Sequence, residues 1–168
     1  MTTNVSTRGD FPVSPDRMLA IMTDHELVSR RHRQQGALEV GITDRREGEH
    51  VLVQEVALRE YHRTMRGIDP DKVVDAHTSY RWDLDARICT WRYRGDRGEQ
   101  VQIDGRIAIL PAEQGAEVQS EVQVKVPVPL IGSVIEKRIA REIDEGFAPF
   151  EKLLREFCAR VDGGTGDA

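Results

Sequence analysis

The sequence is short of aromatic residues, of cysteine and of long apolar runs. Phenylalanine, tryptophan and tyrosine make up 5% of its 168 residues, and its two cysteines, Cys89 and Cys158, lack the spacing of a metal site. Two cysteines do not make a secreted disulfide framework. The apolar run from Val126 to Ile131 contains two prolines and is far shorter than the roughly 20 residues that span a bilayer. We therefore expect no integral membrane segment and, since residues 1–10 carry no signal-peptide pattern, a cytoplasmic location.

A surplus of basic residues is also absent. The chain has 24 lysines and arginines against 29 acidic residues, for a net charge of -5 at pH 7. Because phosphate neutralisation needs a basic surplus, we expect no nucleic-acid partner. The sequence has no His-x-His, Cys-x-x-Cys or His-Glu-x-x-His motif, so we expect neither a metal nor a cofactor. His25 and His32 lie two helical turns apart, about 10 Å, which is too far to share a metal, and we interpret them as surface histidines.

What is present is the composition of a globular domain, with 39% hydrophobic and 32% charged residues. The length suits one domain. We predict a single domain over residues 1–161 and a flexible, small and polar tail over residues 162–168. Both cysteines fall on apolar stripes of the predicted elements, which favours buried and inert thiols.

Two short helices are predicted after a first strand at residues 5–11. Ser14 and Pro15 form a helix start, with serine as the N-cap and proline at the first helical position. A capping box that begins at Thr23 opens the second helix, which we expect to end at Gly36.

The middle of the chain alternates between apolar and polar residues, which is typical of half-buried strands. Short turns join these strands, so we expect antiparallel pairing with one polar face. A break is predicted at residues 67–71, which contain a glycine and a proline. The expected strands cover residues 38–43, 51–58 (extending toward 64), 76–84, 89–93, 101–109 and 118–126.

One long helix is predicted from a second capping box at Ser133 to about Val161, bent by Gly146 and Pro149. A helix is about 10 to 12 Å wide, whereas six or seven strands at about 4.8 Å spacing form a sheet more than twice as wide. The sheet must therefore curl around the helix. The predicted fold class is α+β: a curved antiparallel sheet of six to seven strands wrapped around one long C-terminal helix, with two short helices after the first strand.

This order of elements resembles the START-like helix-grip superfamily, which includes polyketide cyclases, plant pollen-allergen-type proteins and lipid-transfer domains. The likeness is strongest to an uncharacterised bacterial family within it. The residues that carry it run from Tyr80-Arg81-Trp82 through Ile103-Asp104-Gly105 to Val122–Pro127, and continue into Ile131–Lys137. Here two extra residues follow Pro127, and Ser133 replaces a glycine of the usual turn. The resemblance implies binding of an apolar or amphipathic small molecule in a central cavity. It brings no shared catalytic motif, so no catalytic residue is assigned.

Valine and isoleucine dominate the predicted inner face, and their small size favours a cavity. The clustered Tyr80, Trp82, Trp91 and Tyr93 fit either a pocket floor or plain core packing. Predicted lining residues are Met18, Met22, Tyr80, Trp82, Trp91, Tyr93, Ile103, Val122, Val124, Ile135, Ile139, Phe147, Phe150 and Leu154.

Few polar residues are candidates for contact with a ligand. Glu55 and Tyr61 are predicted polar anchors for a ligand. The basic clusters at residues 30–33 and 59–66 fit an anionic headgroup site at the cavity mouth, although a solvated face is the favoured interpretation.

Three functions remain open from the sequence. The leading hypothesis is non-catalytic binding or transport of a hydrophobic ligand, such as a lipid or a polyketide-like molecule. The second is a cyclase or aromatase that uses the same cavity, with Glu55, Tyr61 or Tyr80 as the first residues to inspect. The third is a protein-interaction module with a filled core, which forms a homodimer through a sheet edge.

Overall fold

The computed structural model describes residues 2–64 and 66–164. Over these residues the chain forms one seven-stranded antiparallel sheet in the order β1-β7-β6-β5-β4-β3-β2. The strands are β1 (Thr3–Phe11), β2 (Ala37–Arg46), β3 (Val51–Thr64), β4 (Gly67–Asp83), β5 (Ile88–Arg94), β6 (Gln102–Ala112) and β7 (Gly115–Lys125). The helices are α1 (Pro15–Met22), α2 (His25–Gln34), the short 3-10 helix η1 (Gly98–Gln100) and α3 (Gly132–Gly164).

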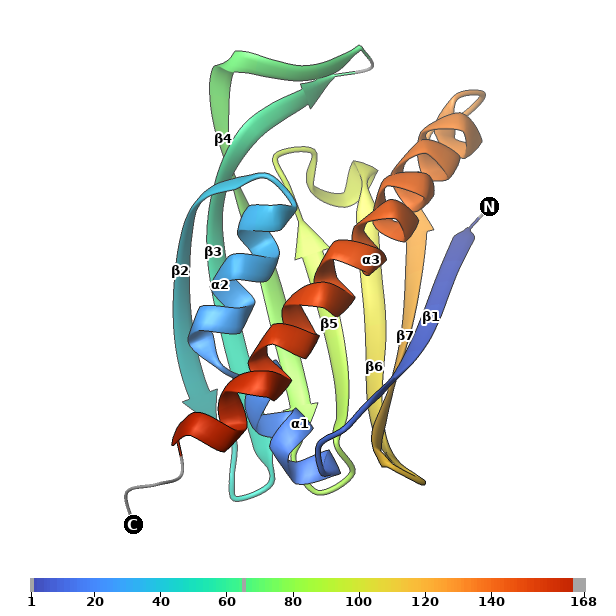
Figure 1. Cartoon of the computed structure of the whole chain (residues 1–168). Helices are drawn as coiled ribbons and strands as arrows, with labels where there is room; N and C mark the ends of the chain where they lie inside the picture. The colour runs from blue at the N-terminus through green and yellow to red at the C-terminus, as the bar shows by residue number, and fades with distance from the viewer. Residues whose placement is uncertain (1, 65, 165–168) are drawn as a thin grey trace.

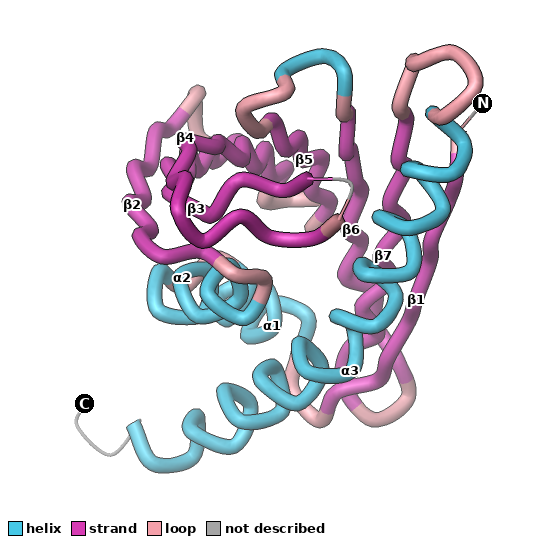
Figure 2. The backbone as a smooth tube through the Cα atoms, turned by 90° about the horizontal axis from the view of Figure 1, so that it is seen from above, coloured by secondary structure: helices cyan, strands magenta, loops and turns pink. Residues whose placement is uncertain are grey.

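The predicted helix-grip architecture is confirmed. The sheet curves around α3, and α1 and α2 cover one end of its concave face (Figure 1). α3 packs on β1 and β7 along one side of the sheet and then on α1 and α2. Figure 2 shows this placement from above, with the axis of α3 changing direction along its length.

The two short helices begin on side-chain caps. Ser14 caps α1 as predicted, since its Oγ accepts a hydrogen bond from the Arg17 backbone N–H at 3.1 Å. α2 is capped by Asp24 and not by Thr23, because the Asp24 carboxylate accepts from two backbone N–H groups, at 2.8 and 3.3 Å. Thr23 instead ends α1, and its hydroxyl donates to the Leu19 carbonyl at 2.9 Å.

The predicted break at residues 67–71 is part of strand β4. β3 and β4 remain paired up to Thr64 and Gly67, with a register shift between Tyr61 and His62. β5 pairs only with the segment from His77 to Asp83, so the start of β4 extends beyond its other neighbour. Pro70 lies in the bulge between Asp69 and Val73, where β4 has no paired residue in β3 or β5, so no ladder bond is lost there.

The long helix extends beyond its predicted limits at both ends. It starts at Gly132, so Ser133 lies inside the helix instead of capping it. It continues through Pro149 to Gly164, three residues beyond the predicted end at Val161. Residues 165–168 of the predicted tail lie outside the described residues. No described helix has the length and apolar character needed to cross a bilayer.

The inward face of the sheet carries the main core. Ala76, Thr78, Tyr80 and Trp82 are all buried there, as their alternation predicted. The core packs the sheet against α1, α2 and the second half of α3, whereas a smaller cluster around Val124 lies against the first half of α3.

Candidate ligand-binding site

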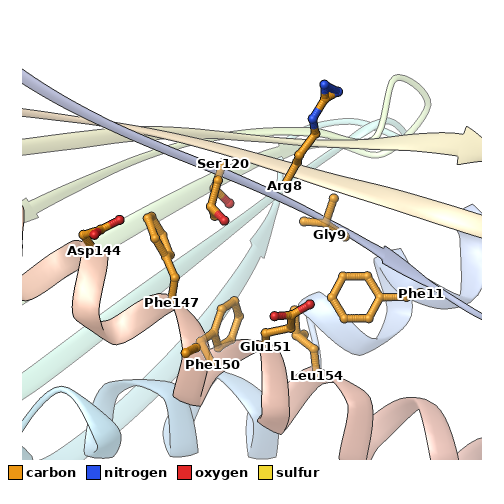
Figure 3. A pocket seen from close by; sticks show the side chains of 12 residues that line it. Arg8, Gly9, Phe11, Ser120, Asp144, Phe147, Phe150, Glu151 and Leu154 are labelled. Carbon is orange, nitrogen blue, oxygen red and sulfur yellow. The ribbon is translucent and has the colours of Figure 1, made fainter.

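A hollow of about 270 Å³ lies between β1, β7 and α3 (Figure 3). Its walls combine aromatic and aliphatic side chains with charged groups. The hollow approaches the lower end of the range of small-molecule sites, about 300 Å³. The lining residues are Thr7, Arg8, Gly9, Phe11, Val118, Ser120, Asp144, Phe147, Ala148, Phe150, Glu151 and Leu154.

Small side chains on the two strands help to create this space. Thr7 pairs with Ser120 and Gly9 with Val118 in the β1–β7 ladder, so these four residues face α3 side by side. A Cβ atom at Gly9 would lie 3.2 Å from Glu151 Oε1, which is a tight contact. The glycine therefore lets α3 approach β1 without filling the hollow.

A hydrogen bond and a ring contact from Arg155 hold α3 against β1 at the edge of the hollow. Arg155 donates to the Asp10 carbonyl at 3.0 Å and to Glu151 Oε1 at 3.0 Å. Its guanidinium also lies 4.8 Å from the centre of the Phe11 ring. These contacts fix two of the walls, Phe11 and Glu151, relative to each other.

The concave face of the sheet continues the site with aromatic side chains. Tyr80 is buried and its ring centre lies 6.2 Å from that of Trp91. Trp91 and Tyr93 face the same side of β5 but are only half-buried, as is Ile103 on β6. These three side chains pack against the core clusters and keep part of their surface uncovered on the inward face.

His32 was expected at the surface, and that prediction is wrong. Its ring is buried beneath α2, and Nε2 lies 2.9 Å from the Tyr80 hydroxyl. Burial, with the nearby Arg31 charge as a second cause, lowers the pKa of His32 to about 3, whereas burial raises the pKa of Tyr80. His32 is therefore neutral at pH 7 and pairs with a protonated phenol. His25 is exposed as predicted, 3.0 Å from Asp44.

The basic cluster at residues 30–33 divides between the surface and the interior. Arg30 forms an ion pair with Glu156 of α3 at 2.6 Å. Arg31 is half-buried, and its guanidinium carbon lies 4.3 Å from the centre of the Phe150 ring and 6.0 Å from that of Tyr80. One arginine of the cluster thus reaches the residues around the hollow.

A second polar group lies near the far end of β3. The Tyr93 hydroxyl donates to Glu60, and His62 Nδ1 lies 2.6 Å from Asp96 Oδ2. Burial and the adjacent Glu60 carboxylate raise the pKa of Tyr93. Sequence reasoning did not single out Glu60 or Asp96, because neither belongs to a recognisable motif.

The two predicted anchors do not face the interior. Glu55 accepts a hydrogen bond from Ser79 at 3.0 Å and contacts His77, both on the outer face of β4. Tyr61 is half-buried and follows Glu60 in β3, so it projects to the face opposite Glu60. Both faces of β3 carry apolar residues, which is why alternation alone misplaced Glu55.

The predicted lining residues occupy three kinds of position. Only Phe147, Phe150 and Leu154 border the hollow. Fully buried in the packed core are Met18, Met22, Tyr80, Trp82, Val122 and Val124. Half-buried along the inward surface are Trp91, Tyr93, Ile103, Ile135 and Ile139. The wall formed by β1 was missed because nothing local in residues 7–11 indicates that they pair with β7.

The described part of the chain contains no group of three or more histidine, cysteine, aspartate or glutamate side chains that could hold a metal ion. Cys89 and Cys158 are unlinked and buried. Burial raises the pKa of Cys89 to about 12, and it also raises that of Cys158. Both thiols are thus protonated and poor nucleophiles at neutral pH.

Comparison with family models identifies the chain's relatives. Residues 6–158 match a family described as a protein of unknown function, DUF2505. The chain belongs to this family. No curated protein matches the sequence.

Solved structures share the fold of this DUF2505 protein at low sequence identity. TTHA0849 from Thermus thermophilus is 14% identical, with 96% of this chain and 99% of that chain covered and a TM-score of 0.65. The Zhui aromatase/cyclase from Streptomyces sp. R1128 is 11% identical, with 100% of both chains covered and a TM-score of 0.60. A START superfamily protein from Mycobacterium smegmatis is 17% identical, with 98% and 99% covered and a TM-score of 0.58. The predicted START-like helix-grip fold is confirmed.

Proposed function

We propose that this protein binds a hydrophobic or amphipathic small molecule between α3 and the concave face of the sheet, without transforming it. The hollow of about 270 Å³ beside Phe147 and Phe150 is the observation that carries the proposal. Each Å² of apolar surface buried there contributes roughly 25 cal/mol before the costs of association. A hollow of this size suits a small ligand or one part of a larger one.

The wider inward surface extends this proposed site. We assign contacts with the ligand to Phe147, Phe150 and Leu154, and then to the half-buried Trp91 and Tyr93. The buried residues beneath them, including Met18 and Trp82, act as a rigid support. The shared fold with a START superfamily protein and with an aromatase/cyclase supports an interior site. A cytoplasmic location is part of the proposal, and the two unlinked cysteines support it.

Filling the hollow tests the proposal. Ser120→Phe places a large ring in the hollow from β7, and we expect it to abolish the fluorescence gain of the neutral apolar dye N-phenyl-1-naphthylamine on addition of protein. Glu121→Phe is the matched control, since it puts the same ring on the outer face of the same strand. Ala148→Phe fills the hollow from α3 and serves if Ser120→Phe does not fold. Equal dye binding by wild type and both filled variants would refute the site.

A cyclase-type enzyme is the second candidate, and one observation favours it. Tyr93 and Glu60 form a hydrogen-bonded ionisable pair beside the inward surface. If the protein is an enzyme, Tyr93→Phe removes turnover of a poly-β-ketone thioester but leaves dye binding intact. Absence of turnover by wild type, with dye binding retained, favours the binding function. The third candidate is an interaction module with a filled core, and the hollow between β1, β7 and α3 favours the binding function over it.

A further inference from the structure

Arg31 is placed unlike its neighbour on α2. Arg30 points outward and pairs with Glu156. Arg31 points toward the interior, where its guanidinium contacts the rings of Phe150 and Tyr80. Among the side chains of residues 2–64 and 66–160 and the backbone described with them, no group forms a hydrogen bond or ion pair with the Arg31 guanidinium.

An arginine in this position gives up part of its hydration without gaining a hydrogen bond from the described residues. A guanidinium carries five N–H donors, and contact with the faces of two rings satisfies none of them. Removing charge from water costs free energy unless a counter-charge and hydrogen bonds replace the water. The adjacent His32–Tyr80 pair offers no such partner, because the Tyr80 hydroxyl is hydrogen-bonded to His32 and His32 is neutral at pH 7. Within the described residues, the charge of Arg31 thus lacks a protein counter-ion.

Phe150 connects Arg31 with the hollow. The ring lines the hollow and lies 4.3 Å from the guanidinium carbon. Two carboxylates, Asp144 and Glu151, also line the hollow, and they would repel an anion placed beside them. The one arginine among the lining residues, Arg8, already pairs with Glu117 at 3.5 Å. A ligand with an apolar body and one negative group is therefore favoured with its charge at Arg31.

We propose that the ligand is an amphipathic anion, whose apolar part occupies the hollow against Phe147 and Phe150 and whose carboxylate or phosphate pairs with Arg31. This inference rests on the function proposed above and specifies its ligand class. Arginine suits the role because its planar donors match both carboxylate and phosphate oxygens.

Titration calorimetry with matched ten-carbon probes tests the inference. We expect decanoate or decyl phosphate to bind wild type about tenfold or more tightly than decan-1-ol, the scale of a charge-assisted hydrogen bond. Arg31→Gln is expected to abolish this preference while keeping decan-1-ol affinity. Arg30→Gln is the matched control and is expected to retain the preference, since Arg30 faces Glu156.

The outcomes separate the two proposals. If decan-1-ol binds and the anions bind no better, or if Arg31→Gln keeps the preference, the anion site is refuted and the apolar site stands. If no probe binds wild type, both are refuted. If inorganic phosphate displaces decanoate at comparable concentration, the site serves a free anion and the amphipathic assignment is wrong. Arg31→Met keeps an apolar stem over Phe150 and replaces Arg31→Gln if the latter does not fold.

Discussion

At the scale of single residues, the buried His32 makes stability depend on pH. Its pKa is near 3 in the folded chain, against about 6.5 when exposed. Between these values the unfolded chain binds a proton that the folded chain does not, so the free energy of unfolding falls as pH falls through this window. Above about pH 6.5 His32 is neutral in both the folded and the unfolded chain, so the free energy of unfolding no longer depends on pH through this residue.

His32→Gln tests that dependence. Between pH 7 and pH 5, His32 alone is expected to lower the free energy of unfolding of wild type by about 2 kcal/mol. The fall in the His32→Gln variant should be smaller by this amount. Urea unfolding at the two pH values gives the comparison, with the exposed His25→Gln as control. Parallel losses in wild type and His32→Gln would show that His32 is not the group responsible.

Gly105 is a residue whose side chain must be absent. It pairs with Trp91, and a Cβ atom at this position would lie 2.1 Å from Trp91 Cε2. Gly105→Ala is expected to displace the indole and to lower stability by about 1 to 3 kcal/mol. Urea unfolding and the near-ultraviolet circular dichroism of tryptophan measure both effects. Gly41→Ala is the control, because no atom lies within 4 Å of its added Cβ, and an equal loss in both variants would exclude the ring clash.

At the scale of elements, the first turns of α3 contain a buried acid. Glu136 is 1% exposed, and its Oε1 has no hydrogen-bond partner among the described residues. A buried oxygen without a partner costs about 1 to 3 kcal/mol. Glu136→Met keeps the length of the side chain and is expected to raise the free energy of urea unfolding by about 1 kcal/mol. Glu145→Met, on the exposed face of α3, should change it by less than about 0.5 kcal/mol, and a large loss in Glu136→Met would mean that the carboxylate is stabilising.

The same helix shows what sequence patterns resolve and what they miss. The apolar stripe from Ile135 onward predicted a long amphipathic helix, because a period near 3.6 is a strong local signal. The capping pattern at Ser133 was wrong, since it is equally compatible with a helix that starts one residue earlier. In the sheet, alternation placed Tyr80 and Trp82 correctly, yet it failed at Glu55, where both faces of β3 are apolar.

At the scale of the whole molecule, the order of elements was predictable and the site was not. Periods, turns and caps are local, so they appear in the sequence as short patterns. The hollow joins Thr7, Ser120 and Phe147, which are far apart in the chain and carry no shared pattern. Arg31 illustrates the same limit, because a run of basic residues does not reveal which member turns inward.

Ligand binding is expected to stabilise the entire fold. A molecule that binds only the folded chain adds about 2.7 kcal/mol at a concentration 100 times its Kd. For a chain of this length that corresponds to an increase in Tm of about 5 °C or more. Differential scanning calorimetry with decanoate measures this shift, and Ser120→Phe should show none. A shift of equal size in that variant would place the ligand elsewhere.

The pairing of β1 with β7 also determines when the hollow can form during synthesis. The wall with Thr7 and Phe11 emerges from the ribosome before the central strands, whereas Phe147 and Leu154 emerge after them. The hairpins from β2 to β6 can assemble before that, since their partners are close in the chain. A nascent chain can therefore pair its central strands before the hollow is complete, and deletion of either β1 or α3 would remove a wall of the hollow while leaving the central strands in place.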